Sequence, residues 1–413
     1  MRDAGTTGAN QFSEGAPLQY TPVDFSPSPE KKRRVLVLSE IISPYRIPVF
    51  NALARHEAVD LHVVFLAETD PQLRQWRVYR DEIKFSYEVL PSWRIRFAGH
   101  NVLLNWGVTS GLRKFGPETI ICGGYNYYAS WEALSWAARH NAGFVLWSES
   151  NRQDARRGRA WTERLKSHFL SRCDGFAVPG KSAGDYLVSL GVNAERITSA
   201  PNAIDNERFA TEAENIRNRA SEFRYKLGLP ERFILFVGRL AEAKGVFDLL
   251  EAYGRLGDDV RSELGLVFAG DGDCRPELER RAKGILRGKI CFTGFVHRED
   301  LAGLYALSEA LVLPTHSDTW GLVVNEAMAC GLPIVVTSVA GCAADLVENE
   351  WNGYVVPPED PAALKVAIAH LASNTEIRQQ MGLRSSQRIQ EYSPEACACG
   401  LATAALATGR RSR

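Results

Sequence analysis

Two acidic side chains, Asp318 and Glu326, stand eight positions apart in the segment PTHSDTWGLVVNEAMACGLPIV, residues 314–335. The polar letters THSD follow a short apolar run and supply helix N-cap residues. The letters GLVVNEAMAC have helical spacing until Gly331 and Pro333 end it. Asp318 is therefore predicted just before a helix N-terminus and Glu326 inside that helix. Because the amides of a first helical turn lack partners within the helix, the region between the acids is a predicted anion site.

Two cations follow another predicted strand. The run FILFVG (233–238) is followed by RLAEAKG, so that Arg239 and Lys244 come five positions apart, directly after Gly238. Arginine offers a planar fork of donors and lysine a point charge, and together they suit a diphosphate. Exposed Arg and Lys are also common at protein surfaces, so the spacing alone leaves that plainer interpretation open.

Further polar or glycine-containing loops follow the next apolar runs. Gly270 precedes the letters DGD, in which Asp271 and Asp273 formally resemble a divalent-metal pair. A Gly-Asp-Gly turn explains these letters better, and we predict no metal site. Phe295 and Val296 follow the letters FTG, where their main chain could face a planar base.

These loops require a scaffold of parallel strands. Apolar runs alternate with helix-like segments from residue 35 to about 180, and the pattern restarts after SAPNAIDNERF (199–209). Such alternation predicts an α/β chain of two doubly wound Rossmann-like domains, with ligands bound at strand ends in the cleft between them. The predicted division is a disordered tail, a first Rossmann-like domain, a second Rossmann-like domain and a C-terminal tail: residues 1–30, 31–205, 206–395 and 396–413.

Composition constrains the partners of this 413-residue chain. Basic and acidic side chains number 49 each, so no bulk charge favours nucleic acid or a bilayer. Residues 1–30 carry 1 basic and 4 acidic side chains, residues 31–205 carry 24 and 17, and residues 206–413 carry 24 and 28. The net charges are thus −3, +7 and −4. The basic first half could attract an anionic acceptor or membrane surface, and ordinary scatter is the alternative.

The cysteines and the hydropathy favour a cytoplasmic protein. Eight scattered cysteines show no paired metal spacing. The start of the chain has no apolar signal-peptide core, and no run of about 18 apolar residues could span a bilayer. A reducing cytoplasm, with attachment to the inner face of a membrane as an option, is the expected location.

The order of these motifs resembles that of the retaining glycosyltransferases of family 4, which have the GT-B fold. The matching pieces are GRLAEAKG (238–245), FAGDG (268–272), FTGFV (292–296), the segment 314–335 and PNAIDNERF at the linker. The resemblance covers roughly residues 170–395 well and the first half loosely. It implies that a hexose moves from a UDP- or GDP-linked donor to a glycan or lipid-linked acceptor, in polysaccharide or glycoconjugate synthesis, without metal or cofactor.

The resemblance also implies roles for single residues. Arg239 and Lys244 would neutralise the donor diphosphate. Glu326 would accept hydrogen bonds from two ribose hydroxyls, since a carboxylate has two oxygens for two vicinal donors. Asp318 would hold hydroxyls of the transferred sugar. The remaining donor-binding residues would act mainly through the backbone: Gly238, Gly270, Phe295, Val296, Trp320, Gly321 and Leu322.

The chain departs from the family pattern at three places. Asp318 stands where the family usually has the longer Glu, which leaves the donor sugar open. After the first strand, SEIISPYRIPVF (39–50) replaces a glycine-rich loop, and Arg46 is a candidate to supply the positive charge. Alternatively Pro44 and Pro48 only shape a turn. Glu149 stands where many members have His, as a candidate for binding hydroxyls or as an ordinary capping or ion-pairing residue.

The acceptor side carries weaker signals. In CGGYNYYASW (122–131), Gly124 would let the backbone approach a ligand, and Tyr125 and Asn126 could line an acceptor pocket. Two aromatic and basic stretches, residues 92–106 and 156–161, could contact a membrane, although ordinary helix faces are the alternative. A sugar-nucleotide epimerase of the same architecture and a non-catalytic transferase subunit are the competing functions. No G-x-G-x-x-G follows the first strand, which argues against a dehydrogenase.

Overall fold

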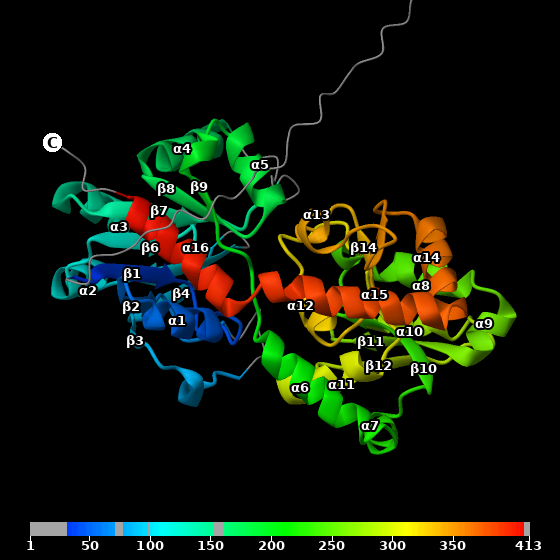
Figure 1. Ribbon diagram of the computed structural model, residues 1–413. Helices are drawn as coiled ribbons and strands as arrows, with labels where there is room; N and C mark the ends of the chain where they lie inside the picture. Colours follow the sequence, from blue (N-terminus) through cyan, green and yellow to red (C-terminus); the bar gives the residue numbers. More distant parts are fainter. Residues whose placement is uncertain (1–30, 71–76, 98–99, 152–159, 409–413) are drawn as a thin grey trace, which may run out of the picture. The chain divides into compact units, whose positions relative to one another are not determined.

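The computed structural model describes residues 31–70, 77–97, 100–151 and 160–408, and the fold below belongs to the unit that begins at Lys32 (Figure 1). The predicted tail at residues 1–30 lies outside the described residues. Two parallel sheets, each covered by helices, form two lobes, as the alternating pattern predicts. None of the helices in the described ranges combines the length and the hydropathy needed to cross a bilayer.

The first lobe is built on a seven-stranded parallel sheet in the order β3-β2-β1-β6-β7-β8-β9. Its central strands are buried runs of apolar residues, which is the pattern of a sheet covered on both faces. The strands are β1 (Arg33–Ser39), β2 (Val59–Phe65), β3 (Ser86–Val89), β6 (Thr119–Cys122), β7 (Gly143–Trp147), β8 (Gly175–Val178) and β9 (Ile197–Ser199).

Helices pack on both faces of this sheet. One face carries α1 and α16, and the other carries α2, α3, α4 and α5, each with its own hydrophobic core. The helices are α1 (Arg46–Arg55), α2 (Val108–Phe115), α3 (Tyr128–His140), α4 (Ala160–Arg172), α5 (Lys181–Ser189) and α16 (Pro394–Ala407), with short 3-10 turns η1 (Arg80–Glu82) and η3 (Ala194–Arg196).

The C-terminal segment differs from the expected tail at residues 396–413. Residues Pro394–Ala407 form α16, the red helix in Figure 1, which returns from the second lobe and packs beside α1. Leu401 and Cys397 of this helix are fully buried in the first lobe's core. The helix therefore completes one face of the first sheet, and the last residues, 409–413, lie outside the described ranges.

One of the two stretches considered for membrane contact forms a hairpin. Strands β4 (Ser92–Phe97) and β5 (His100–Asn105) pair antiparallel as a separate two-stranded sheet. The alternative of an ordinary helix face is therefore wrong for residues 92–106. The other stretch, residues 156–161, lies almost entirely outside the described residues.

The second lobe has a six-stranded parallel sheet in the order β12-β11-β10-β13-β14-β15. The predicted strand runs of this half each correspond to one strand. The strands are β10 (Arg232–Val237), β11 (Leu264–Ala269), β12 (Ile290–Gly294), β13 (Ala310–Leu313), β14 (Ile334–Thr337) and β15 (Gly353–Val356).

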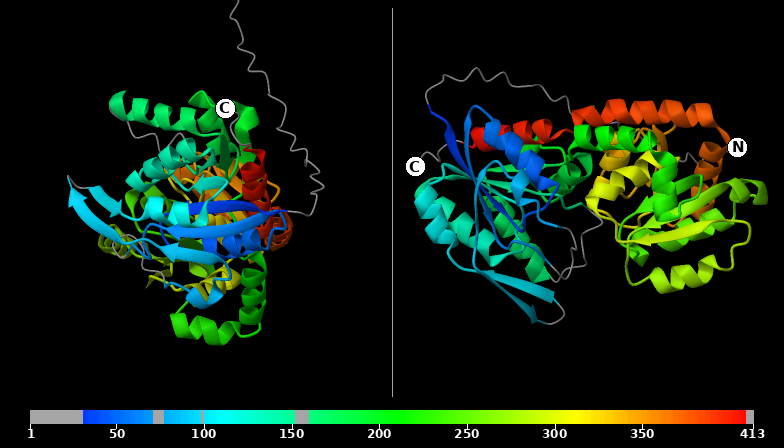
Figure 2. Two further views of the ribbon diagram at one scale, coloured as in Figure 1. Left: turned by 90° about the vertical axis from the view of Figure 1, so that its left-hand side faces the viewer. Right: turned by 90° about the horizontal axis from the view of Figure 1, so that it is seen from below.

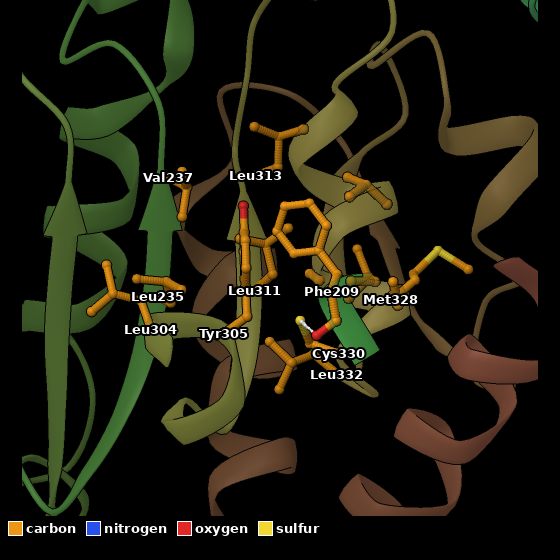
Figure 3. Close-up of a cluster of buried hydrophobic side chains, with 14 of the residues drawn as sticks. Phe209, Leu235, Val237, Leu304, Tyr305, Leu311, Leu313, Met328, Cys330 and Leu332 are labelled. Carbon is orange, nitrogen blue, oxygen red and sulfur yellow. Dashed lines mark hydrogen bonds between the residues drawn. The ribbon is translucent and has the colours of Figure 1, made fainter. Parts of the chain in front are cut away.

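Two cores cover the faces of this second sheet. Figure 3 shows part of one, in which Tyr305 lies among Leu311, Leu304 and Phe209 with its hydroxyl directed toward Leu313 at the end of β13. The helices are α6 (Asn206–Arg217), α7 (Ala220–Leu227), α8 (Val246–Gly254), α9 (Asp258–Glu263), α10 (Arg275–Ala282), α11 (Arg298–Leu307), α12 (Leu322–Ala329), α13 (Ala343–Leu346), α14 (Pro361–Ser373) and α15 (Thr375–Arg388), with η4 (Glu242–Lys244) and η5 (Ile389–Glu391).

Candidate functional site

A cavity of about 850 Å³ opens at the carboxyl ends of β10, β11 and β12. It is lined mainly by the second lobe, with a contribution from loops of the first. The first-lobe residues are Pro44, Tyr45, Arg77 and Tyr79. The structure brings seven of the predicted site residues together in its wall: Gly238, Arg239, Lys244, Gly270, Phe295, Val296 and Glu326.

Glycines allow the loops around this cavity to approach one another. Gly238 and Gly270 have φ values of 149° and 145°, which disfavour other residues. A Cβ on Gly270 would lie 1.9 Å from the Gly238 carbonyl oxygen. Gly245, with φ 64°, lies against Pro314, whose carbonyl oxygen would be 1.8 Å from an added Cβ. These contacts hold the loop that carries Lys244 against the end of β13.

The two predicted phosphate-binding cations have different surroundings. Arg239 is exposed and has no salt bridge to any residue in the described ranges. Lys244 is half-buried, and its Nζ lies 2.5 Å from Oδ2 of Asp318. The structure thus joins one cation of the strand-end loop to the first acid of the segment 314–335, which sequence spacing alone did not indicate.

Asp318 and Glu326 take the predicted positions relative to α12 (Leu322–Ala329). Asp318 precedes the helix, and Gly321 is its N-cap with φ 99°. The Asp318 backbone carbonyl accepts a hydrogen bond from Asn151 Nδ2 of the first lobe at 2.9 Å. Asp318 therefore stands where the two lobes meet, close to Lys244.

Glu326 lies inside α12, and its side chain is fully buried. The Tyr305 hydroxyl donates a hydrogen bond of 2.6 Å to its Oε2. Burial raises the pKa of Glu326 to about 7, and the phenols of Tyr305 and Tyr45 partly oppose that rise. The Tyr45 hydroxyl is thus a second phenol within hydrogen-bonding reach of this carboxyl group, which lies in the cavity wall.

Tyr45 is the main site residue that the sequence analysis missed. It follows β1 in the first lobe, yet its ring packs on a core cluster of the second lobe and its hydroxyl faces Glu326. Burial and the neighbouring carboxylate raise the pKa of Tyr45. The sequence favours its neighbour Arg46 as a candidate, and no local pattern assigns the tyrosine to a carboxylate about 280 residues away.

Arg46 and Glu149 are paired with each other and do not line the cavity. The Arg46 guanidinium carbon also lies 3.9 Å from the centre of the Trp147 ring, and its Nη1 donates to Asn202 Oδ1 at 3.2 Å. The charge of Arg46 is thus balanced inside the first lobe, beside the cavity wall formed by Tyr45.

The remaining predicted residues lie outside this cavity. Trp320 is buried, and its indole Nε1 donates to Asn325 Oδ1 at 2.8 Å. Its neighbours Gly321 and Leu322 are likewise absent from the cavity wall. On the acceptor side, Gly124, Tyr125 and Asn126 follow β6 and also lie outside it.

Tyr79 and Arg298, which the sequence did not single out, close one side of the cavity. The Arg298 guanidinium carbon stands 3.6 Å from the centre of the Tyr79 ring, and its two Nη atoms contact Glu82 at 2.5 and 3.1 Å. Tyr79 donates a hydrogen bond of 2.8 Å to Glu299. These contacts hold the η1 segment of the first lobe against α11.

The Asp271 loop has the geometry of a turn. Asp271 Oδ1 accepts a hydrogen bond from the Gly272 amide at 2.8 Å, and its Oδ2 contacts Arg275 at 3.2 Å. Within the described ranges, no group of three or more His, Cys, Asp or Glu residues is arranged to hold a metal ion.

The two lobes each match a model of a known protein family. The family model described as glycosyl transferases group 1 matches residues 218–388, and the model for glycosyltransferase family 4 matches residues 50–208. An alpha-D-kanosaminyltransferase from Streptomyces kanamyceticus is 36% identical over 40% of this chain and 42% of its own length. A D-inositol 3-phosphate glycosyltransferase from Xylanimonas cellulosilytica is 30% identical over 60% of each chain. The chain thus spans about half the length of these curated relatives.

A solved structure of Anabaena HepE in complex with UDP superposes with a TM-score of 0.72, at 17% identity. The superposition covers 91% of this chain and all of that one, and it establishes a shared fold. The two family models together cover most of the chain, on both lobes. The chain belongs to the family 4 glycosyltransferases, whose second half is the glycosyl transferases group 1 domain, and it has the GT-B fold.

Proposed function

We propose that the protein is a retaining, metal-independent glycosyltransferase that moves a hexose from a UDP- or GDP-linked donor to a glycan or lipid-linked acceptor. The observation that carries the proposal is the composition of one cavity wall, which holds Arg239, Lys244 and the buried carboxyl of Glu326. Two cations suit the diphosphate, and the carboxylate suits the ribose hydroxyls. The sugar would then lie toward Asp318.

The proposed reaction exchanges one bond at the anomeric carbon for another. The bond from this carbon to the donor phosphate oxygen breaks, and a bond to the acceptor oxygen forms on the same face. The acceptor proton passes to the departing phosphate. Arg239 and Lys244 stabilise the negative charge that grows on the diphosphate. Lys244 has three donor hydrogens, so it can hold a phosphate oxygen while it keeps its contact with Asp318.

Asp318 and the first lobe supply the proposed sugar and acceptor contacts. Asp318 is tied to Lys244 and, through its carbonyl, to Asn151, so its carboxylate has a fixed position beside the proposed diphosphate site. We assign hydroxyls of the transferred hexose to Asp318, because a carboxylate in this position accepts from sugar hydroxyls. Glu149 and the segment with Gly124 are the candidates for acceptor contacts.

The test begins with a donor screen on the purified chain. A bound nucleoside diphosphate raises the melting temperature by mass action, so a thermal-shift screen of UDP, GDP and their sugars identifies the donor class. With that donor, R239A and K244A should each lower turnover by about 10²-fold, as the loss of a transition-state donor does. R280A, which removes an exposed Arg on α10, is the matched control and should behave as the wild type.

Other outcomes would contradict the proposal. Wild-type turnover in the R239A/K244A double variant would exclude the assigned roles. NMR of the products distinguishes the competing activities, because an epimerase releases an altered sugar nucleotide without any acceptor. Tight nucleotide binding with no turnover on any acceptor would indicate a non-catalytic subunit.

A further inference from the structure

The carboxyl group of Glu326 is covered by other parts of the protein. Glu326 lies in the wall of the cavity, yet its exposed fraction is 0%. Under the proposed function, this carboxyl receives the ribose hydroxyls of the donor. A ligand hydroxyl has to come within about 3 Å of a carboxylate oxygen to make a hydrogen bond. One of the groups that cover Glu326 therefore has to move before a donor can bind there.

Two tyrosines contact this carboxyl, and they differ in position. Tyr305 donates to Oε2 at 2.6 Å, is itself fully buried in the second lobe's core (Figure 3) and is not part of the cavity wall. Tyr45 has its hydroxyl within hydrogen-bonding reach of the same carboxyl, is partly exposed and lines the cavity. Of the two phenols, Tyr45 is thus the one on the side from which a ligand enters.

Tyr45 reaches the carboxyl from the other lobe. It directly precedes α1, the blue helix of the first lobe in Figure 2, whereas Glu326 belongs to α12 of the second lobe. The residues after Tyr45 are held in the first lobe, since Arg46 pairs with Glu149 and Ile47 is buried in the core. The Tyr45 ring nevertheless packs on a core cluster of the second lobe. Because Tyr45 is not part of that lobe's own fold, it can leave Glu326 while the second sheet stays intact.

Tyr45 and a ribose compete for one carboxyl group. The phenol fills the cavity side of the carboxyl and donates one hydrogen bond, and ribose hydroxyls donate to the same oxygens. We propose, on the basis of the proposed function, that Tyr45 occupies the ribose position in the donor-free protein and determines donor affinity, because it must leave Glu326 before the ribose binds. Only molecules with Tyr45 displaced are competent, and the apparent affinity is lower by their fraction. A weaker hold of Tyr45 on Glu326 therefore raises the affinity for the nucleotide.

The experiment is isothermal titration of the full chain with UDP and with GDP. Y45F keeps the ring and removes the hydrogen bond to Glu326, so it should lower the Kd of the nucleotide that binds by about tenfold. Y305F removes the other phenol, which does not stand in the path of the ligand, and should not lower the Kd. Y225F, at an exposed position of α7, is the matched control and should bind as the wild type does.

Two further measurements assign the gain in Y45F to competition with the ribose. In stopped-flow binding, Y45F should raise the association rate constant and leave the dissociation rate constant unchanged, because Tyr45 acts before the ribose is bound. The 2′,3′-dideoxy form of the same nucleotide has no ribose hydroxyl to offer to Glu326. With this ligand, Y45F should bring no gain in affinity.

The possible failures can be told apart. If UDP or GDP binds the wild type and E326Q weakens that binding, while Y45F leaves the Kd unchanged or raises it, this proposal alone is wrong. An equal gain for the dideoxy nucleotide, or an equal gain in Y305F, also overturns it, because the gain would then not come from the ribose position. If neither UDP nor GDP binds the wild type or Y45F, the proposed function fails, and this proposal fails with it. Far-ultraviolet circular dichroism confirms that each variant is folded.

Discussion

At the scale of the residue, the buried carboxyl of Glu326 combines a proposed ligand contact with a cost to stability. Its carboxyl is fully buried, and its pKa of about 7 lies well above its ordinary value of 4.5 because burial penalises the charged form. The folded protein therefore holds this proton more tightly than the unfolded chain does. As the pH rises from about 4.5 to about 7, the unfolded chain loses the proton first, and stability falls across that interval.

We expect E326Q to be more stable than the wild type at pH 8, by up to about 3 kcal/mol for a pKa shift of this size. The difference should disappear near pH 4, where the native carboxyl is already protonated. Urea unfolding at the two pH values measures it. E277Q is the control, since the pKa of Glu277 is lowered to about 2 by exposed arginines and its loss brings no such gain. Nucleotide affinity should fall in E326Q, and an unchanged affinity would contradict the proposed ribose contact.

Some residues of the candidate site can be predicted from the sequence, and some of their contacts cannot. Arg239, Lys244 and Glu326, which share one cavity wall, could be proposed from the sequence because each follows or lies within a local strand-loop-helix pattern. The Lys244–Asp318 ion pair and the position of Tyr45 were not, because both depend on contacts between segments far apart in the chain. Pairing across such distances is determined by packing, which spacing does not encode.

At the scale of the element, α16 is the helix that the sequence analysis placed least well. Its residues PEACACGLATAALA are nearly all small or apolar. The helix therefore has no polar face, and the sequence does not indicate which side of it is buried or against which element it packs. The alternation of strands was far more informative, since every predicted strand of the second half forms. The structure shows that residues Pro394–Ala407 return to the first lobe.

The packing of α16 against the first lobe can be tested at Gly400. A Cβ at this position would lie 2.0 Å from the Ser199 carbonyl oxygen at the end of β9, which is backbone and cannot rotate away. We expect G400V to destabilise the protein by about 1–3 kcal/mol through overpacking. A407V, at an exposed position of the same helix, is the control and should have little effect. Equal urea midpoints for G400V and the wild type would show that α16 does not pack as described.

At the scale of the whole molecule, the described contacts between lobes come from several separate segments. Asn151 donates to Asp318, Tyr79 and Glu82 hold α11, and Tyr45 faces Glu326. The sequence predicts two Rossmann-like domains but none of these contacts. Each contact joins residues far apart in the sequence, and no local pattern of residues indicates the partner. The cavity that we assign to the donor has walls from both lobes, so its shape depends on how closely they approach.

One further contact between the lobes can be used to measure how nucleotide binding depends on their approach. Asp345, in the second lobe, accepts hydrogen bonds from the Lys181 amide at 3.1 Å to each carboxylate oxygen, at the N-terminus of α5. Gly180 precedes this helix, and a Cβ there would lie 2.5 Å from Asp345 Oδ2. The φ of Gly180 is −179°, an extended conformation open to any residue, so alanine would add only the steric clash with Asp345.

We expect G180A to displace the Asp345 carboxylate from the Lys181 amide and, by loosening this contact between the lobes, to weaken nucleotide binding by up to about tenfold. In G180A/D345A the clash is gone, and affinity should return to that of D345A alone. The two single variants and the double variant form a cycle whose coupling energy isolates the contact. Isothermal titration with the nucleotide found in the donor screen supplies the four affinities. Additive effects of the two substitutions would mean that Gly180 and Asp345 are not coupled, and wild-type affinity in both single variants would mean that nucleotide binding does not depend on this contact.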